Sequence, residues 1–370
     1  MRRQRVLVVL DDCGPGDLLA VNFCLTALRR SMPDARLDCL VSARAASVAE
    51  LTELFDRVMV SRIYQRPSAS RALLLTRKLV AAARVAAAVG GRYDRALTLY
   101  WGSTLLNLIA WCAAPFRSVG YSNLWPRLVR GGLGPYDPAG DPHEQAVALM
   151  AAFGVHAVPA TATVPAMDRA VRRPLSRLPE LDRPYAVLHT GSDWACQMWL
   201  PERWARVADA LSLDRGLLPV FTGSAPDEQP GVDRIRSLMR EESDSVVGQT
   251  SVADLARLME GAELCVCVDT LPFEVAISVG VPTVVMAGQS RAALAARGAG
   301  PAVVVNRTGP EERRAILDCK LTVIKAAYGA CHDWECPMAG LRGIQVEDVL
   351  GAVDELLRAP GPPVVVGVSP

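Results

Sequence analysis

The alternation of short, apolar, β-branched runs with helical stretches is the feature that most constrains the fold of this 370-residue chain. The runs fall into two series. The first comprises Val6–Leu10, Leu37–Val41, Val58–Ser61, Ala96–Leu99 and Ser118–Gly120, and the second includes Tyr185–His189, Leu217–Phe221, Leu264–Val268 and Thr283–Met286. Such alternation predicts parallel sheets with helices on both faces, and therefore an α/β protein with two doubly wound domains.

A proline-rich, charged stretch separates the two series and marks the expected domain boundary. Residues 164–184 hold four prolines and eight charged residues, a composition typical of linkers. We therefore expect an N-terminal domain at 1–170, a linker at 171–184 and a C-terminal domain at 185–345. A final amphipathic helix and tail occupy 346–370, and the Pro/Gly-rich end predicts a strap or a loose end. The residues expected on the apolar face of this helix are Val346, Val349, Leu350, Val353, Leu356 and Leu357.

Composition argues against several classes of partner. The formal net charge is +1 and aromatic residues make up 5% of the chain, so neither a nucleic acid nor an anionic membrane is favoured by bulk charge or stacking capacity. The apolar stretch near the start, Val6–Leu10, is shorter than the core of a signal peptide, which predicts a cytoplasmic protein. The uncharged stretch 96–116 fits a buried strand and a helix capped by Ser103 better than a membrane span.

Ten cysteines are scattered along the chain without a CxxC pair, and a cytoplasmic location would keep them reduced. Four residues near the end raise the question of a metal site, and they are Cys319, Cys331, His332 and Cys336. Their spacing does not match a structural zinc site, so a cysteine-bearing surface loop is the favoured interpretation and no metal is predicted.

The first motif that could take part in a reaction follows the opening strand. Gly14 and Gly16 allow a tight turn, and Asp17 comes at the start of a helical pattern. An aspartate there is a good N-cap residue. It is also placed to act as a general base beyond the carboxyl end of a strand.

Further motifs lie in the second half, where small residues follow predicted strands. Turns of this kind offer backbone N–H groups to a phosphate, although each is equally compatible with an ordinary connection. Glu274, in the first turn of a helix, is also explained by the helix dipole. The residues concerned are Thr190, Gly191 and Ser192, then Thr222 and Gly223, and finally Asp269, Thr270, Pro272 and Glu274.

Taken together, these motifs resemble glycosyltransferase family 9, the heptosyltransferases. Beyond Gly16-Asp17, the similar stretches in order are PDARLDCLVSARAASVAE, HTGSDWACQMWLPERW, FTGS, GQTSVADLARLMEGAELCVCVDT, LPFEVAISVGVPTVVMAG and CPMAGLRGIQVEDVL. The resemblance implies a GT-B fold, with two Rossmann-like domains facing a central cleft. It further implies an acceptor on the N-terminal domain, a nucleotide-sugar on the C-terminal domain, and metal-independent inversion with Asp17 as the base. The donor residues that it implies are Gly16, Thr190, Gly191, Ser192, Gln197, Thr222, Gly223, Gly248, Asp269, Thr270, Pro272 and Glu274.

The chain departs from the family pattern at charged positions. Gln197 stands where the family has a lysine, Glu274 where it has a histidine, and Leu271 where it has a glycine. Asp11 and Asp12 occupy the stretch where the first strand usually ends in a basic residue. The loss of positive charge should weaken stabilisation of the leaving group, although helix N-termini and Arg203 could compensate.

These departures leave more than one function open. The chain is either an active enzyme with an altered donor or acceptor, or a catalytically impaired nucleotide-sugar-binding protein of the same fold. A nicotinamide-dependent epimerase ranks last, because GPGDLLA lacks the third glycine of the GxGxxG fingerprint.

The hints about the acceptor conflict. The extra acids suit a polar or cationic group, whereas residues 61–92 contain no acid and suit an anionic acceptor, a membrane surface or a solvated arginine-bearing helix. We expect transfer of a heptose-like sugar from an ADP-sugar to a hydroxyl or amine of a small molecule or glycoconjugate, such as a specialised metabolite. Apart from this co-substrate, no cofactor is expected.

Overall fold

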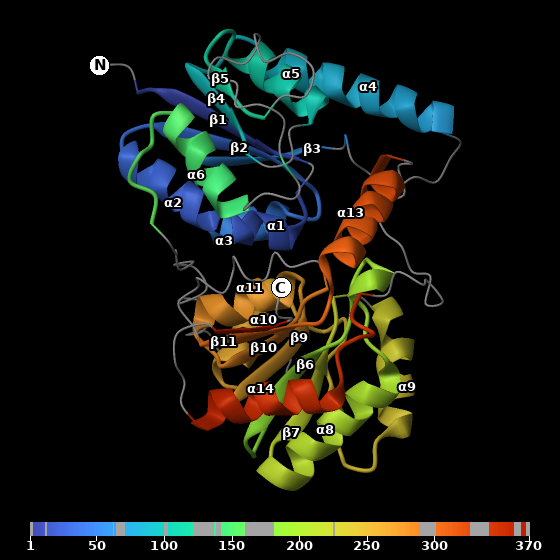
Figure 1. Cartoon of the computed structure of the whole chain (residues 1–370). Coiled ribbons are helices and arrows are strands. Elements are labelled where there is room, and N and C mark those ends of the chain that lie inside the picture. The colour runs from blue at the N-terminus through green and yellow to red at the C-terminus, as the bar shows by residue number, and fades with distance from the viewer. Residues whose placement is uncertain are drawn as a thin grey trace. The chain divides into compact units, whose positions relative to one another are not determined.

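The structure is a computed structural model, and it describes residues 3–11, 13–61, 63, 71–99, 103–121, 137, 142–159, 181–224, 226–288, 301–325, 340–358 and 364–367. The chain divides into two compact units, Met1–Pro165 and Ala166–Pro370 (Figure 1). Most of the predicted linker, 171–184, lies outside the described residues. The predicted bounds of the domains therefore stay predictions.

The first unit is built on a parallel five-stranded sheet in the order β3-β2-β1-β4-β5, so the opening strand is its centre. Residues Val6–Leu10 of this strand are fully buried, as expected for a parallel strand covered on both faces. The strands are β1 Arg5–Leu10, β2 Arg36–Ser42, β3 Arg57–Ser61, β4 Arg95–Thr98 and β5 Ser118–Val119.

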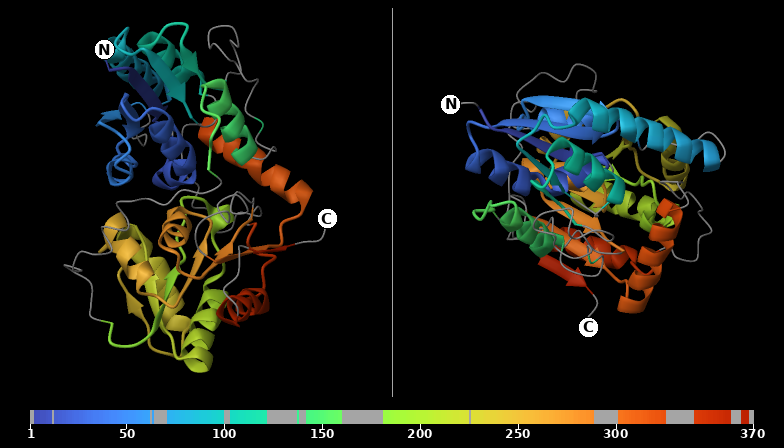
Figure 2. Two further views of the ribbon diagram at one scale, coloured as in Figure 1. Left: turned by 90° about the vertical axis from the view of Figure 1, so that its left-hand side faces the viewer. Right: turned by 90° about the horizontal axis from the view of Figure 1, so that it is seen from above.

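Six helices cover this sheet. Helices α4 and α5 lie together over one face, and the other four cover the opposite face (Figures 1 and 2). Their bounds are α1 Pro15–Ala20, α2 Asn22–Ser31, α3 Ala46–Leu51, α4 Arg71–Val89, α5 Thr104–Ala113 and α6 Pro142–Ala152. The helical pattern predicted after β1 is broken at Val21, which ends α1 and precedes α2.

The second unit has a parallel seven-stranded sheet in the order β12-β11-β10-β9-β6-β7-β8. Its strands are β6 Tyr185–His189, β7 Leu218–Thr222, β8 Asp244–Ser245, β9 Leu264–Val268, β10 Thr283–Met286, β11 Ala302–Asn306 and β12 Val364–Gly367. Its helices are α8 Pro201–Arg215, α9 Gln229–Leu238, α10 Val252–Glu260, α11 Leu271–Val279, α13 Pro310–Lys325 and α14 Val346–Arg358, with short 3-10 helices η1 Ala195–Gln197 and η2 Pro226–Glu228. Both units therefore confirm the predicted α/β class with two doubly wound sheets.

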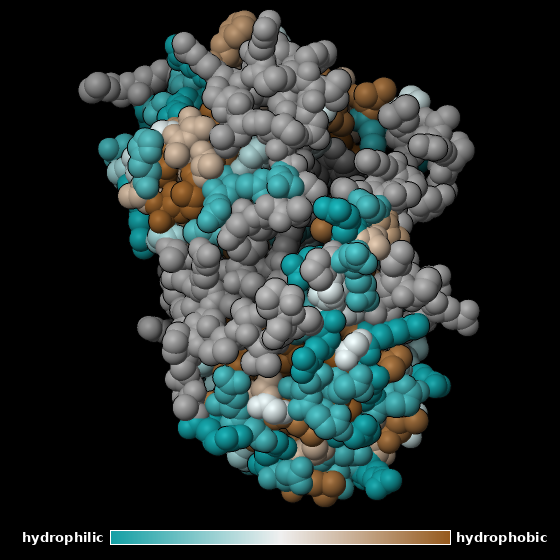
Figure 3. All heavy atoms as spheres, in the orientation of Figure 1, coloured by the Kyte–Doolittle hydropathy of each residue, from teal (hydrophilic) through white to brown (hydrophobic). Residues whose placement is uncertain are grey.

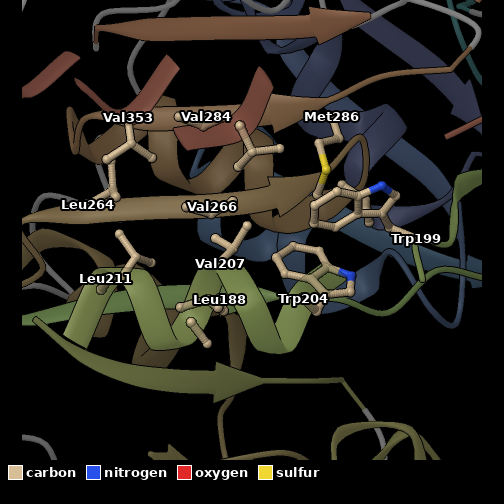
Figure 4. Packing of buried hydrophobic residues seen from close by; sticks show 14 of the residues in the cluster. Leu188, Trp199, Trp204, Val207, Leu211, Leu264, Val266, Val284, Met286 and Val353 are labelled. Atoms are coloured by element: carbon tan, nitrogen blue, oxygen red, sulfur yellow. The ribbon is translucent and has the colours of Figure 1, made fainter. Parts of the chain in front are cut away.

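The core of the second unit lies between its sheet and helices α8 and α14. Figure 4 shows Trp199 and Trp204 beside Met286, and the two indole rings meet edge to face with their centroids 5.4 Å apart. Such a pair contributes about 0.5–1.5 kcal/mol beyond the burial of its surface. The Trp199 Nε1–H donates to the carbonyl of Ile344 at 3.1 Å, and this bond ties the segment before α14 to the core.

Two predictions for the C-terminal end need correction. The tail is not a loose end, because Val364–Gly367 forms β12 and pairs in parallel with β11. Its three valines favour an extended strand, and the β11 edge supplies the hydrogen bonds. In α14 the predicted apolar face is buried at Val346, Val349, Val353 and Leu356, but Leu357 is exposed.

The predicted start of a helix at Ser103 is confirmed, and a second serine caps a helix of the other unit. The Ser103 hydroxyl accepts the Leu106 N–H at the start of α5, and Ser251 caps α10 through the Asp254 N–H. Of the four residues considered and not favoured as a metal site, Cys331, His332 and Cys336 lie outside the described residues. Within the described parts of the chain, no helix has the length and apolar character needed to cross a membrane.

Candidate functional site

In the first unit, polar side chains stand at the carboxyl ends of four adjacent strands. Asp11 follows β1, and β2, β3 and β4 end in Ser42, Ser61 and Thr98. All four residues are buried. Ligands of doubly wound sheets bind at this edge, so the row marks the candidate site of this unit.

Asp11 is the most unusual member of the row. It is 1% exposed, and neither carboxylate oxygen has a hydrogen-bond partner of normal geometry among the described residues. Burial raises the pKa of Asp11 to about 6, and the nearby Ser61 hydroxyl partly opposes this rise. The carboxyl group therefore changes its charge close to neutral pH.

Asp17 lies in the first turn of α1, half-buried. Asp17 is not the N-cap residue that its position suggested: Gly14 takes that position, and Asp17 is the third residue of the helix, whose Oδ2 accepts the Gly14 N–H at 2.9 Å. A Cβ on Gly14 would lie 3.2 Å from the same oxygen, which explains a small residue there. Gly16 precedes Asp17 in the same turn. One capping bond uses one of the roughly four acceptor positions of a carboxylate, so a role as a base is compatible with capping.

In the second unit, the predicted donor residues collect at one edge of the sheet. Strands β9, β6, β7 and β8 are neighbours, and the residues follow their carboxyl ends. Thr190, Gly191, Ser192 and Gln197 come after β6, Thr222 and Gly223 after β7, Gly248 after β8, and Asp269, Thr270, Pro272 and Glu274 after β9. Gly248 has a φ of +69°, which favours glycine, and its N–H donates to the Gly223 carbonyl at 2.9 Å.

Gln197 connects two of these loops. Its Nε2 donates to the backbone carbonyl of Asp269 at 2.9 Å, and its Oε1 accepts the Ser192 hydroxyl at 3.0 Å. The side chain is buried. Gln197 thus links the loop after β6 to the loop after β9 by hydrogen bonds. Its place in the sequence did not predict this role.

His189 ends β6 and is buried, with Nδ1 3.0 Å from the Thr222 hydroxyl. Burial lowers the pKa of His189, while the charge of Glu228 and a backbone hydrogen bond at Gly191 oppose the shift. The imidazole is therefore neutral at neutral pH and brings no positive charge to this edge.

Sequence reasoning missed Glu228, the last residue of η2. Its Oε1 accepts the Ser224 N–H at 2.9 Å and the Ser224 hydroxyl at 2.6 Å. A Cβ added to Gly191 would lie 1.9 Å from Oε2, and one added to Gly223 would lie 3.3 Å from it. The carboxylate therefore fills the space in front of both glycine turns. Its signal in the sequence is the pairing of Ser224 with an acid four residues later.

The start of α11 supplies the last predicted group. Thr270 is extended, and its N–H donates to the Val268 carbonyl at 2.8 Å. Pro272 is buried in the first turn of the helix and Glu274 is half-buried there. This edge therefore carries several carboxylates, among them those of Glu228, Asp269 and Glu274, where an anionic ligand was expected.

A late segment of the chain also reaches this edge. Gly340 packs against Gly288, which follows β10, and a Cβ on Gly288 would lie 3.3 Å from it. The Thr308 hydroxyl fixes the segment by donating to the Gly340 carbonyl at 2.9 Å. Arg203 donates to the carbonyls of Arg342 and Ile344, so its guanidinium holds this segment and does not take the place of the lysine replaced by Gln197.

Comparison with known proteins agrees with this arrangement. Residues 143–312 match the model of Glycosyltransferase family 9 (heptosyltransferase). This stretch of the chain is similar to glycosyltransferase family 9, which supports a glycosyltransferase. The matched residues include every predicted donor residue from Thr190 to Glu274 but not Asp17. A search of curated proteins found no match.

Solved structures share the fold of this chain at low sequence identity. A family 9 glycosyl transferase from Veillonella parvula is 18% identical with a TM-score of 0.67, over 96% of this chain and 97% of that one. The E. coli ADP-heptose lps heptosyltransferase II is 16% identical with a TM-score of 0.65, over 96% and 99%. The E. coli heptosyltransferase WaaC with ADP is 17% identical with a TM-score of 0.59, over 88% and 99%.

Proposed function

We propose that this protein is an inverting glycosyltransferase of family 9 that takes a heptose-like sugar from an ADP-sugar. The acceptor is a hydroxyl or amine of a small molecule or glycoconjugate, such as a specialised metabolite. One observation carries the proposal: loops after four adjacent strands bring eleven predicted donor residues to one edge of the second sheet. The ADP and ADP-heptose named for solved heptosyltransferases support the choice of donor.

In the proposed reaction, Asp17 acts as the general base. Its carboxylate takes the proton of the acceptor group while the acceptor atom bonds to the anomeric carbon. The bond between that carbon and the diphosphate breaks, and the nucleoside diphosphate leaves with the electron pair. The Gly14 N–H bond to Asp17 fixes the direction of the carboxylate, which reduces the reorganisation needed for proton transfer.

On the donor side, hydrogen bonds replace the positive charges that the family pattern supplies. Gln197 holds the loop after β6 on the Asp269 carbonyl, so backbone N–H groups of Thr190–Ser192 keep one arrangement. Neutral donors stabilise a leaving diphosphate less well than a lysine, since charge-assisted hydrogen bonds are about twice as strong. We therefore expect a slow enzyme that depends on preorganisation.

The proposal assigns no metal to the reaction. Among the described residues, no group of three or more histidine, cysteine, aspartate or glutamate side chains is arranged to hold a metal ion. Metal independence and a cytoplasmic location remain parts of the proposal, to be tested by activity in the presence of a chelator and by cell fractionation.

A second candidate is a nucleotide-sugar-binding protein with impaired catalysis. Two contacts favour it: both ends of the Gln197 amide are engaged by the protein, and the Glu228 carboxylate lies in front of the glycine turns. This candidate predicts binding of the donor without release of the nucleoside diphosphate in the presence of any acceptor.

The first experiment compares ADP, UDP, GDP and ADP-heptose by calorimetry and by thermal shift. A ligand at 100 times its dissociation constant adds about 2.7 kcal/mol to the free energy of unfolding, which raises the melting temperature measurably. Stabilisation by the adenosine ligands alone supports the proposed donor. A preference for uridine or guanosine, or no response to any ligand, would contradict it.

A further inference from the structure

The polar residues at the carboxyl edge of the first sheet share one face of that sheet. We name Asp11, Ser42, Ser61 and Thr98 the edge row. Thr98 lies beside Val9 in the parallel register, and Asp11 follows Val9 by two residues, so both side chains lie on the Val9 face. Ser42 lies beside Ser61, and the Ser61 hydroxyl is near the Asp11 carboxyl group. Val9 packs in one core cluster with residues of α4 and α5, so the edge row lies on the face that these helices cover.

A fifth polar side chain joins the edge row from helix α5. Asn107 is buried, and its Nδ2 donates to the Tyr121 carbonyl. A Cβ built on Gly120 would collide with the Asn107 Oδ1 and lie 3.1 Å from the Thr98 Cβ, so the Asn107 oxygen and Thr98 are neighbours beside this glycine. Gly120 follows β5, the strand next to β4, so the polar groups continue along the edge from β3 to β5.

The edge row and Asn107 hold more hydrogen-bond acceptors than donors. Neither oxygen of Asp11 has a partner of normal geometry among the described residues, and the same is true of the Asn107 Oδ1 and the Thr98 hydroxyl. The Ser42 hydroxyl already donates to the Cys13 carbonyl at 3.2 Å. An ionised carboxylate and an amide oxygen can only accept, and buried polar atoms are normally paired. A group that donates several hydrogen bonds would therefore complete this edge.

The edge row also carries a negative charge that no described cation neutralises. Figure 3 shows hydrophilic side chains over much of the described surface, where water solvates charge, whereas Asp11 is 1% exposed. Among the described residues, no Lys, Arg or His is paired with Asp11. Asp38 on the neighbouring strand is also 1% exposed, but it pairs with Arg36 at 2.9 Å. Asp11 thus lacks the partner that the same sheet supplies to another buried aspartate.

An organic cation fits these groups better than a metal ion. Among the described residues, no group of three or more histidine, cysteine, aspartate or glutamate side chains could hold a metal. A protonated primary amine brings one positive charge and three hydrogen-bond donors. The charge matches the single carboxylate of Asp11, and the donors match the oxygens of Asp11, Asn107 and Thr98.

We propose that the edge row binds the ammonium group of an acceptor that is a polyhydroxylated primary amine, as amino sugars and aminocyclitols are. Ligands of doubly wound sheets bind at this edge. An acceptor with a phosphate or carboxylate there is disfavoured, because Asp11 would repel it. The inference rests on the proposed function only for the role of the bound molecule as acceptor, since recognition of the amine requires no donor.

Binding of this kind decides which acceptor group takes the sugar. Asp11 follows β1 and Asp17 lies in the first turn of α1, so the two carboxyl groups flank one connection. An amine held as ammonium has no lone pair with which to attack, so the nucleophile is a hydroxyl of the same molecule. Its proton passes to Asp17 while its oxygen bonds to the anomeric carbon, and the nucleoside diphosphate leaves with the electron pair. The product is an O-glycoside that keeps its amine.

Titrations of the full-length protein, followed by NMR, test the recognition of the amine. The probes are glucosamine and 2-deoxystreptamine, each beside its N-acetylated form, with potassium chloride as a bare cation. We expect the two amines to bind at least about tenfold more tightly than the acetylated forms, which have lost the charge. Equal binding of amine and acetylated forms, or no binding of either amine, would overturn the proposal. So would a response to potassium chloride that equals the response to the amines.

A matched pair of variants assigns the charge. Asp11→Asn keeps the size of the side chain and should weaken binding of the amines about 30-fold or more, as for a lost buried charge pair, with the acetylated forms unaffected. Asp34→Asn removes the same charge from an exposed position of the first unit and should leave binding unchanged. An equal loss in both variants would mean that overall charge and not Asp11 attracts the amines.

Thr98→Val tests whether the groups act as one site. The Thr98 hydroxyl is buried without a partner among the described residues, so its removal should keep or raise the melting temperature. Binding of glucosamine should nevertheless fall about tenfold, because one oxygen facing the ammonium is lost. Unchanged binding of glucosamine in this variant would contradict a site that extends from Asp11 to Thr98.

Calorimetric binding of ADP-heptose separates this inference from the proposed function. Donor binding without any preference for the amines would overturn the inference and leave the proposed function standing. Preference for the amines without donor binding would do the reverse. When both bind, mass spectrometry of the product should show the sugar on oxygen, and a sugar on nitrogen would contradict the ammonium contact with Asp11.

Discussion

The polar side chains at the carboxyl edges of the two sheets differ in how completely they are hydrogen-bonded. In the second unit the side chains are joined to one another or to the backbone: Gln197 to Ser192 and Asp269, His189 to Thr222, and Glu228 to Ser224. In the first unit, Ser42 and Ser61 have partners, but both oxygens of Asp11 and the Thr98 hydroxyl are buried with no hydrogen bond of normal geometry among the described residues. Preorganisation therefore characterises the edge of the second sheet, and incompletely satisfied polar groups characterise the edge of the first.

This difference has a physical meaning. A buried polar group without a partner costs about 1–3 kcal/mol, and natural proteins retain few of them. The first unit bears this cost at Asp11, which follows β1 and lies six residues before Asp17 in the sequence. We interpret Asp11 as a group that an acceptor satisfies, and its carboxyl group suits a ligand that donates hydrogen bonds.

The largest expected effect concerns Asp17. Asp17→Asn removes the proposed base but keeps an oxygen for the Gly14 N–H, so the turn should persist. We expect sugar transfer to fall about 10²- to 10⁴-fold, the usual contribution of general base catalysis, with donor affinity within a few-fold. Quantifying ADP release with acceptor present, alongside calorimetric donor binding, checks both. Transfer at the normal rate would remove Asp17 from the mechanism.

Asp11 should have the next largest effect, on stability. Its pKa is raised from 3.8 to about 6, so the folded state binds a proton more readily than the unfolded state between these values. Its contribution to stability is present below about pH 4 and is lost as pH rises through 6, a difference of about 3 kcal/mol. We therefore compare the free energy of unfolding of Asp11→Asn with that of the wild type at each pH, by urea unfolding. The difference between variant and wild type should be more favourable to the variant at pH 7.5 than at pH 4.5.

Asp38 is the matched control for Asp11. It lies on the neighbouring strand β2 and is also 1% exposed, but its carboxylate accepts hydrogen bonds from Arg36 and the Tyr93 hydroxyl. Asp38→Asn should lower stability at pH 7.5, because the ion pair with Arg36 is lost and the bond from the Tyr93 hydroxyl is no longer charge-assisted. If both variants move stability in the same direction, then the presence of partners is not what distinguishes the two aspartates.

Much of this organisation was predictable from the sequence. Strands β6, β9 and β10 have the predicted bounds, because a buried parallel strand is a continuous apolar run between turn residues. The glycine turns also identified loops that meet at one carboxyl edge of the second sheet. These signals are local, so a single sequence carries them in full.

What the sequence did not reveal depends on contacts between distant segments. The sequence suggested that Gln197 is a weakened phosphate ligand. In the structure its amide donates a hydrogen bond to the carbonyl of Asp269, 72 residues away. The C-terminal valines read as a loose end because their partner strand, β11, had not been recognised. Glu228 was missed since only the fold brings it against Gly191.

A smaller effect is expected at Glu228 and tests whether the donor edge is preorganised for phosphate. The carboxylate holds the Ser224 N–H and repels an anion near Gly191 and Gly223. Glu228→Gln keeps the size of the side chain and removes the charge, so the affinity for ADP should rise up to about tenfold, at about 1.4 kcal/mol. Weaker ADP binding in calorimetry would instead assign Glu228 to hydroxyl groups of the nucleotide.

The smallest effect separates capping from catalysis. Asp254 in α10 repeats the geometry of Asp17, because its Oδ2 accepts the backbone N–H of Ser251, three residues earlier, at 3.0 Å. Asp254→Asn should cost about 0.5–1 kcal/mol of unfolding free energy through the weakened cap and helix dipole, and leave sugar transfer unchanged. Asp17→Asn should show a similar loss of stability together with its much larger loss of transfer. If thermal unfolding and turnover respond alike to the two substitutions, then Asp17 is a cap and the proton acceptor lies elsewhere.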